Sequence, residues 1–387
     1  MPTIISQNGI LVSNDLDSAL ASFPAKHLVL HIHGGLVNEE KATKSAKILT
    51  QPLGGDTRTP VFFIWRSGPM ETFLDRLLGP STLALRLGNR ALRSAAPLAT
   101  TDDDALDHCL THESARSAFP ALCDAVVGQS TASERSGLNE AFGASFALRD
   151  ALLPALTLPA AACDAACRRA RARNQYIVNA LNKGGNLSLR ARLQPLWDQM
   201  KQNLETCFSG TPNAVGTSFL AALADRLQAG APPPTISIIA HSAGSIFALR
   251  LIQKAHALNL GVRFHLYLLA PAATFALLNA TAPALHAHVT KLELYGLTSC
   301  REETALVPPS LLTLLARVFE GTSETPILGM ERYHNGCLTH PSIDPALTLL
   351  SNLGATKSWV TDRDHSTIDD YDSSSTAPLK RICGALP

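Results

Sequence analysis

The sequence predicts an α/β fold in which a mostly parallel, doubly wound sheet carries a large helical insertion. Near both ends of the chain, short apolar runs alternate with amphipathic segments, which is typical of strands covered by helices on both faces. A long middle segment rich in Ala, Leu and Arg interrupts this alternation and contains no convincing strand. One apolar run, at 235–240, leads straight into a serine and then into a helical segment. Strands that alternate with helices favour parallel pairing with right-handed crossovers.

The first part of the sheet is expected within residues 1–94. The runs at 27–32 and 61–65 are almost wholly apolar and predict two buried strands. The segment between them has the pattern of a helix, and Asn38 at its start is a suitable N-cap.

Residues 95–215 form the expected insertion. It includes a helical stretch at 195–204, which should begin at Pro195 because the first turn of a helix tolerates proline. An insertion at this point of the chain would lie over the carboxyl ends of the strands, where open α/β sheets bind ligands. The segment is therefore a candidate cap or lid.

Residues 216–387 are expected to complete the sheet. The expected strands lie at 235–240, 262–269, 291–296 and 356–361, with helices at 243–258 and around 309–320.

Composition excludes several classes of protein. The chain has 387 residues, of which 46% are hydrophobic, enough for a large core. A formal net charge of +1 disfavours a nucleic-acid partner and favours a small, neutral or weakly charged substrate. None of the eight cysteines stands in a CxxC pair, which argues against a zinc ribbon or a disulfide scaffold. The first residues lack the pattern of a signal peptide, and no run reaches the ~18 apolar residues of a membrane helix. The expected location is therefore cytoplasmic, without a transmembrane segment.

The segment Ala240-His-Ser242-Ala-Gly244 has the pattern of a nucleophile elbow. In such a turn a serine connects a strand to a helix with strained backbone angles, and small residues two positions away prevent collisions. The hydroxyl of Ser242 would then stand at the end of the sheet, beside the free N–H groups of the following helix. The alternative is an ordinary strand-to-helix turn in which the serine only caps the helix.

A second glycine-containing turn, His33-Gly34-Gly35, follows the strand at 27–32. Glycines allow the backbone to approach a substrate closely. The N–H of Gly35, with Leu36 as its neighbour, and the N–H of Ala243 are therefore the expected oxyanion hole. The alternative is a simple turn after a strand.

The expected general base is His365, which lies in a polar loop just past the last expected strand. From that place it could reach Ser242 and accept its proton. His334 and His340 also lie late in the chain and are the alternatives. His241 precedes the serine, but strand-to-turn geometry should direct its side chain away, so we expect it to serve packing or pocket shape.

The acid that would orient the base is expected after the strand at 291–296. Glu302 is the first candidate, Glu303 the second and Asp344 the third. The alternative for the glutamate pair is a solvated helix start, where the helix dipole favours carboxylates.

These residues, in this order, resemble the α/β-hydrolase superfamily. The resemblance covers about 27–94 and 216–387, and the insertion has no counterpart in it. It implies a serine hydrolase that cleaves carboxylic esters of small molecules or lipids through an acyl-enzyme intermediate, without a metal or an organic cofactor. A lipase or phospholipase, an amidase, and a binding protein that has lost turnover are the alternatives.

Overall fold

In the computed structural model the chain is described at residues 2–12, 16–24, 26–35, 37, 39–66, 189–227, 232–298, 311–320, 324–336, 338–361, 365, 368–371 and 377–387. The sheet belongs to a compact unit that comprises Met1–Glu71, Asp198–Thr298 and Pro326–Pro387. Described residues outside this unit are 189–197, 311–320 and 324–325.

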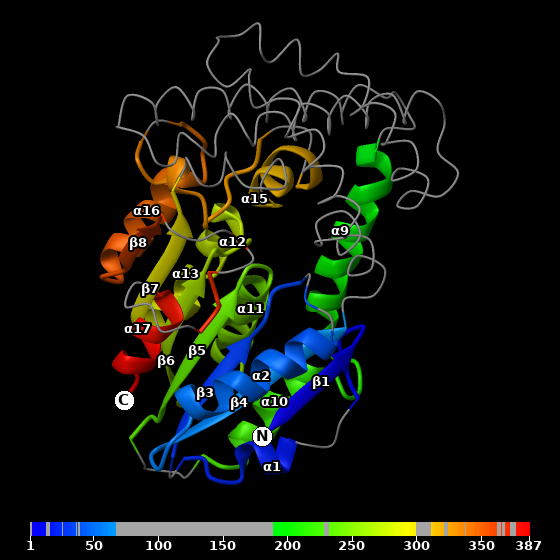
Figure 1. Cartoon of the computed structure of the whole chain (residues 1–387), viewed down its shortest axis with the longest axis vertical. Helices are drawn as coiled ribbons and strands as arrows, with labels where there is room; N and C mark the ends of the chain where they lie inside the picture. Colours follow the sequence, from blue (N-terminus) through cyan, green and yellow to red (C-terminus); the bar gives the residue numbers. More distant parts are fainter. Residues whose placement is uncertain are drawn as a thin grey trace, which may run out of the picture. The chain divides into compact units, whose positions relative to one another are not determined.

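Eight strands form one sheet in the order β2-β1-β4-β3-β5-β6-β7-β8 (Figure 1). Only β2 is antiparallel to its neighbour, and every other pair is parallel. The strands are β1 (Thr3–Gln7), β2 (Ile10–Leu11), β3 (His27–Ile32), β4 (Arg58–Arg66), β5 (Thr235–His241), β6 (Arg263–Leu269), β7 (Val289–Leu297) and β8 (Thr356–Val360). An α/β class with a mostly parallel sheet is therefore confirmed, and so are the expected strands.

The described helices are α1 (Leu16–Leu20), α2 (Glu39–Leu53), α9 (Leu189–Thr206), α10 (Val215–Ala224), α11 (Gly244–Ala257), α12 (Phe275–Ala280), α13 (Ala282–His288), α15 (Leu311–Leu314), α16 (Ile343–Asn352) and α17 (Pro378–Ala385). A π-helical turn, η4 (Leu315–Phe319), continues α15, and η5 (Glu331–Tyr333) is a 3₁₀ turn. Among the residues that the structure describes, no helix combines the length and the apolar character needed to cross a membrane.

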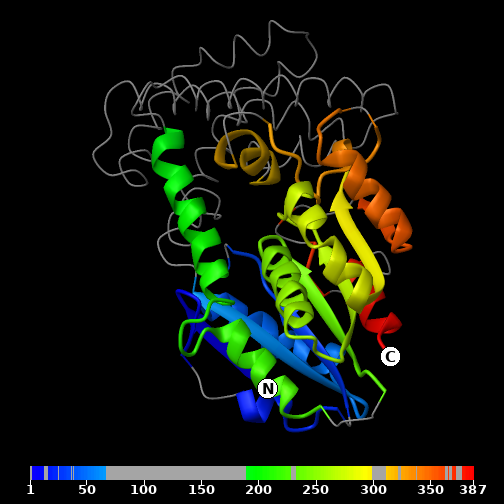
Figure 2. The same ribbon diagram turned by 180° about the vertical axis from the view of Figure 1, so that it is seen from behind.

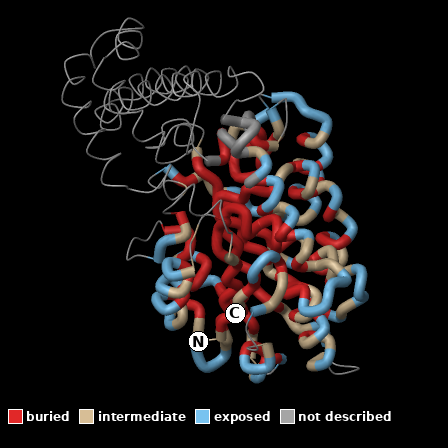
Figure 3. The backbone as a smooth tube through the Cα atoms, turned by 90° about the vertical axis from the view of Figure 1, so that its right-hand side faces the viewer, coloured by how far each residue is buried: buried red, intermediate tan, exposed pale blue. Residues whose placement is uncertain are grey.

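Helices cover both faces of the sheet. α2 and α17 lie in front of it in Figure 1, and α10 and α11 lie in front in the reverse view of Figure 2. Adjacent residues of β4 show the two faces: Phe63 packs against Phe219 of α10 and Phe247 of α11, whereas Phe62 packs against the ring of His31. Because both faces are covered, the strands are buried along most of their length (Figure 3).

The chain changes direction across the sheet between β3 and β5. After β3 it passes through α2 to β4 on one side, and after β5 it passes through α11 to β6 on the other side. The connections therefore diverge above the carboxyl ends of these two neighbouring strands. Such a switch point is where open α/β sheets bind their ligands.

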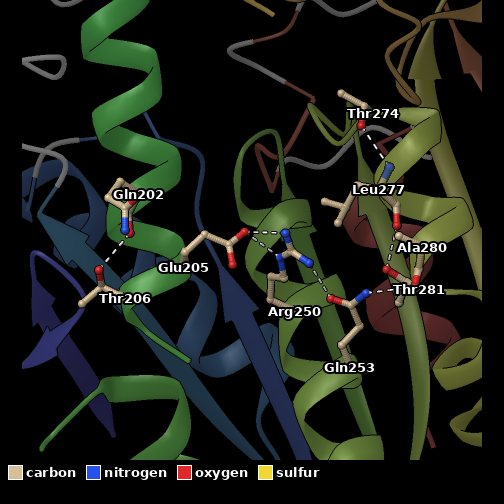
Figure 4. A network of polar contacts seen from close by, with 9 residues as sticks. All are labelled: Gln202, Glu205, Thr206, Arg250, Gln253, Thr274, Leu277, Ala280 and Thr281. Carbon is tan, nitrogen blue, oxygen red and sulfur yellow. Dashed lines mark hydrogen bonds and ion pairs between the residues drawn. The ribbon is translucent and has the colours of Figure 1, made fainter. Parts of the chain in front are cut away.

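Polar side chains join α9 to α11 and α11 to the end of α12 (Figure 4). Arg250 of α11 donates from Nε to Oε1 of Glu205 over 2.8 Å and from Nη1 to Oε1 of Gln253 over 2.8 Å. Gln253 in turn donates to the carbonyl of Ala280 over 3.1 Å. This chain of contacts ties the C-terminal half of α9 to the helix that follows the serine.

The structure differs from expectation at α9. This helix begins at Leu189, so Pro195 lies inside it rather than at its first turn. The pyrrolidine ring leaves the carbonyl one turn earlier without its usual N–H donor. Most of the expected insertion at 95–215 lies outside the described residues, and so does the N-cap candidate Asn38.

Candidate active site

Ser242 occupies a sharp turn between β5 and α11. Its backbone φ is +50°, in the left-handed region that serine rarely adopts. Four hydrogen bonds hold this conformation. The N–H of Ser242 donates to the carbonyl of Leu269 over 2.9 Å. Its own carbonyl accepts from the N–H groups of Ala272 and Ser245, each over 3.0 Å, and from Oγ of Ser245 over 2.6 Å. A strained conformation that its surroundings fix in this way is typical of functional sites.

Glycines allow the β3 loop to pack on this turn. A Cβ atom added at Gly244 would lie only 2.7 Å from the carbonyl oxygen of Ile32 and 2.8 Å from that of His33. A Cβ added at Gly34 would lie 3.2 Å from Cβ of Ser242. The turn after β3 and the turn after β5 are therefore in direct backbone contact, at the switch point of the sheet.

The side chain of His365 contacts that of Ser242. Its Nε2 lies 2.9 Å from Oγ of Ser242, although 123 residues separate the two in sequence. His365 follows β8 and is only partly buried. The serine hydroxyl can donate its proton to this nitrogen, which is the arrangement that a nucleophile and its general base require.

Gly35 and Ala243, the residues of the expected oxyanion hole that the structure describes, lie side by side. A Cβ added at Gly35 would lie 3.2 Å from Cβ of Ala243, so the two backbones approach closely. Ala243 is the N-cap residue of α11, where helix N–H groups have no partner within the helix. Leu36, the third residue expected here, lies outside the described residues.

The position of His241 is the main difference from the expected site. Its ring is buried and makes polar contacts, whereas the sequence indicated a role in packing or pocket shape. Its Nε2 lies 2.9 Å from the carbonyl oxygen of His365, and its Nδ1 lies 3.0 Å from Oδ2 of Asp369. Because a carbonyl can only accept, Nε2 must carry a proton, and a neutral ring would then present a lone pair to the carboxylate.

His241 and Asp369 therefore form an ion pair, in which the histidine side chain is buried and the carboxylate is partly exposed. Burial alone would lower the pKa of His241, but the charge and the hydrogen bond of Asp369 raise it above its usual value. Burial likewise would raise the pKa of Asp369, but the charge of His241 and the hydrogen bond to it lower the pKa of this carboxyl. Both shifts favour the charged forms.

His33 fixes the glycine loop rather than taking part in chemistry. The N–H of Trp65 donates to its Nε2 over 3.2 Å, so Nδ1 carries the proton and donates to the carbonyl of Gly34 over 2.6 Å. This ring is neutral, and burial lowers the pKa of His33 to about 4.

His31 lies on the same face of the sheet as His241, because it stands in register with Ile239 on β5, two residues earlier. Burial lowers its pKa to about 4 as well, although the charge of Asp369 opposes this shift. Its Nε2 has no hydrogen-bond partner among the described residues.

The other expected candidates lie elsewhere or outside the described residues. His334 is partly buried, with Nε2 2.8 Å from the carbonyl of Leu328, and His340 lies 2.9 Å from Ser342 in an exposed turn. Asp344 is exposed in the first turn of α16, where the helix dipole favours a carboxylate. Glu302 and Glu303 lie outside the described residues.

Sequence reasoning missed Asp369, which lies four residues after His365. The available signal was the pair Asp369-Asp370 in the same late polar loop as the histidine. It was overlooked because the resemblance implies an acid that precedes the histidine in the chain.

Among the described residues, no three His, Cys, Asp or Glu side chains gather closely enough to hold a metal ion. Comparisons with protein-family models, curated proteins and solved structures found no match to this chain. The candidate site is therefore interpreted from its own geometry.

Proposed function

We propose that this protein is a serine hydrolase that cleaves carboxylic esters through an acyl-enzyme intermediate. The observation that carries the proposal is the 2.9 Å contact between Oγ of Ser242 and Nε2 of His365, at a turn whose φ of +50° is otherwise unfavourable for serine. A serine that only capped a helix would need neither the strained backbone nor a histidine at its hydroxyl.

The reaction follows from these positions. Ser242 attacks the ester carbonyl while His365 takes the hydroxyl proton, and the N–H groups of Gly35 and Ala243 stabilise the negative charge that develops on oxygen. His365 then returns the proton to the leaving alcohol, and the acyl group stays on the serine. In the second half, His365 takes a proton from the water that attacks the acyl-enzyme, and it returns this proton to Oγ of Ser242 as the bond to the acyl group breaks and the acid leaves.

The architecture agrees with the resemblance to α/β-hydrolases. The nucleophile would follow a central parallel strand, the oxyanion donors would come from the turn after the neighbouring strand, and the base would follow the last strand. Glu302 stays a prediction as the acid, because it lies outside the described residues. A cap formed by 95–215 likewise stays a prediction.

Ester hydrolysis by matched variants tests this function. Wild-type protein should release p-nitrophenol from short-chain p-nitrophenyl esters, and Ser242→Ala should lower kcat on the order of 10³-fold or more, since the serine and its base act as a unit. Ser351→Ala, an exposed serine in α16, is the matched control and should keep the wild-type rate. Ser242→Ala protein that retains a tenth of the activity would exclude the proposal.

The same assay can assign the base. His365→Ala should lose activity as Ser242→Ala does, whereas His340→Ala, in an exposed turn, should not. A mild effect of His365→Ala would show that another group takes the serine proton. Amide and long-chain lipid substrates, measured in parallel, separate an esterase from an amidase or a lipase.

A further inference from the structure

The ring of His241 contacts the segment that carries the candidate base at two points. One ring nitrogen contacts the backbone carbonyl of His365 itself, and the other contacts the carboxylate of Asp369, four residues later. Between these points Ile368 is fully buried. A single side chain at the end of central strand β5 therefore holds both ends of this short stretch.

From this geometry we propose that His241 is a positioning residue: held by Asp369, it donates a hydrogen bond to the carbonyl of His365 and so sets where Nε2 of His365 meets Ser242. The inference rests on the proposed hydrolase function. It assigns a role to two residues that make no contact with the serine hydroxyl and that stand outside the expected set of nucleophile, base and acid.

The charges around His241 are compatible with this role. Asp369 neutralises the imidazolium, so the pair carries no net charge that would oppose protonation of His365, whose ring centroid lies 5.2 Å away. Among the described residues, the other ionisable groups that interact with this pair are His31 on β3, His33 just after β3 and Asp370 in the same late loop. His31 is neutral at physiological pH, because its pKa is lowered to about 4.

Positioning matters here because the candidate base lies in a loop. A general base must stay within hydrogen-bond reach of the proton that it abstracts, and a displacement of 1 Å can lower a rate on the order of 10²-fold. β5 is buried along most of its length and paired on both sides, so it is a rigid anchor. The hydrogen bond from Nε2 of His241 to the carbonyl of His365 attaches the loop to this rigid strand.

Two amide substitutions separate the two contacts of His241. The amide nitrogen of glutamine reaches about as far as Nε2 of histidine, and that of asparagine about as far as Nδ1. His241→Gln should therefore keep the donor to the His365 carbonyl, whereas His241→Asn should lose it. We expect His241→Asn to lower kcat on the order of 10²-fold with KM changed less than about threefold, and His241→Gln to stay within about tenfold of wild type.

His334 provides the control, because it is partly buried and its Nε2 also contacts a backbone carbonyl, that of Leu328. His334→Asn and His334→Gln should differ little in kcat. A folded His241→Asn protein with wild-type kcat, or equal losses in His241→Asn and His241→Gln, would overturn the positioning role.

A second pair of variants covers the case in which the His241 variants do not fold. Asp369→Asn can still bond to the ring and should keep most of kcat, whereas Asp369→Ala should lower it on the order of tenfold or more. Equal kcat in these two variants would also overturn the proposal. If wild-type turnover does not depend on Ser242, the proposed hydrolase function is wrong. If turnover does depend on Ser242, but kcat is equal in His241→Asn and His241→Gln and equal in Asp369→Asn and Asp369→Ala, only the positioning role is wrong.

Discussion

Ser242 carries a local backbone cost, which the proposed function would explain. A non-glycine residue in the left-handed region costs about 1–3 kcal/mol, and glycine removes this cost while adding about 0.4–1 kcal/mol of chain entropy to the unfolded state. Ser242→Gly should therefore be more stable than Ser242→Ala by about 1 kcal/mol, with both inactive. Urea unfolding of the two variants measures the difference, and equal midpoints would mean that the strain at Ser242 is no larger than the entropic cost of glycine.

Gly244 sets how closely the two turns of the site approach. Because an added Cβ would stand 2.7 Å from a backbone oxygen of β3, Gly244→Ala should separate the turns and lower the unfolding free energy by about 1–3 kcal/mol. Gly384→Ala in α17 is the matched control, since nothing lies within 4 Å of its added Cβ. That control should be neutral or more stable by up to about 1 kcal/mol. Similar destabilisation of both variants would contradict this account of the turn.

At the scale of single elements, Pro195 is the clearest departure from local rules. It lies inside α9 and is exposed, so its ring removes a helical hydrogen bond without a compensating buried contact. Pro195→Ala should raise the unfolding free energy by about 1–3 kcal/mol. Pro378→Ala, at the first turn of α17, should bring no such gain, because proline is favoured there. Thermal unfolding of both variants tests this, and a loss of stability in Pro195→Ala would show that the helix depends on its proline.

The strands from β3 to β8 could be predicted because each contains a short apolar run, the pattern of a strand covered on both faces. β1 and β2 were not expected, because β1 mixes apolar and polar residues and β2 has only two residues. The start of α9 could not be predicted from the sequence. A proline normally marks the first turn of a helix, and only the surrounding packing allows a proline to lie inside one. The contact between Ser242 and His365 followed from their places at two strand ends. The pairing of His241 with Asp369 did not, because it depends on how the chain after β8 returns to the end of β5, which no local pattern encodes.

At the scale of the whole molecule, buried neutral histidines should make the fold sensitive to acid. The pKa of His31 and that of His33 are each lowered from 6.5 to about 4, so the unfolded chain takes up protons in this range and the folded protein does not. The stability that they contribute is present above about pH 6.5 and is lost as the pH falls towards 4, on the order of 2 kcal/mol per histidine at pH 5.

The ion pair of His241 and Asp369 affects the unfolding free energy over other pH ranges. The raised pKa of His241 gives a contribution that is lost only as the pH rises above 6.5, and the lowered pKa of Asp369 gives one that is lost only below about 3.8. Urea unfolding at pH 7 and pH 5 should therefore show a net loss on acidification, and His31→Phe should reduce that loss. An unchanged unfolding free energy between these pH values would mean that His31 and His33 are not neutral in the folded protein.

The most direct test of the central claim is covalent labelling with a fluorophosphonate probe, followed by mass spectrometric mapping of the modified residue. Such probes react with a serine whose hydroxyl is activated by a neighbouring base. Wild-type protein should carry one adduct, on Ser242, and Ser242→Ala should carry none. His365→Ala should react far more slowly, because its serine lacks the nitrogen that lies 2.9 Å away in the native protein. An unlabelled wild-type protein, or an adduct on another residue with Ser242 unmodified, would contradict the account.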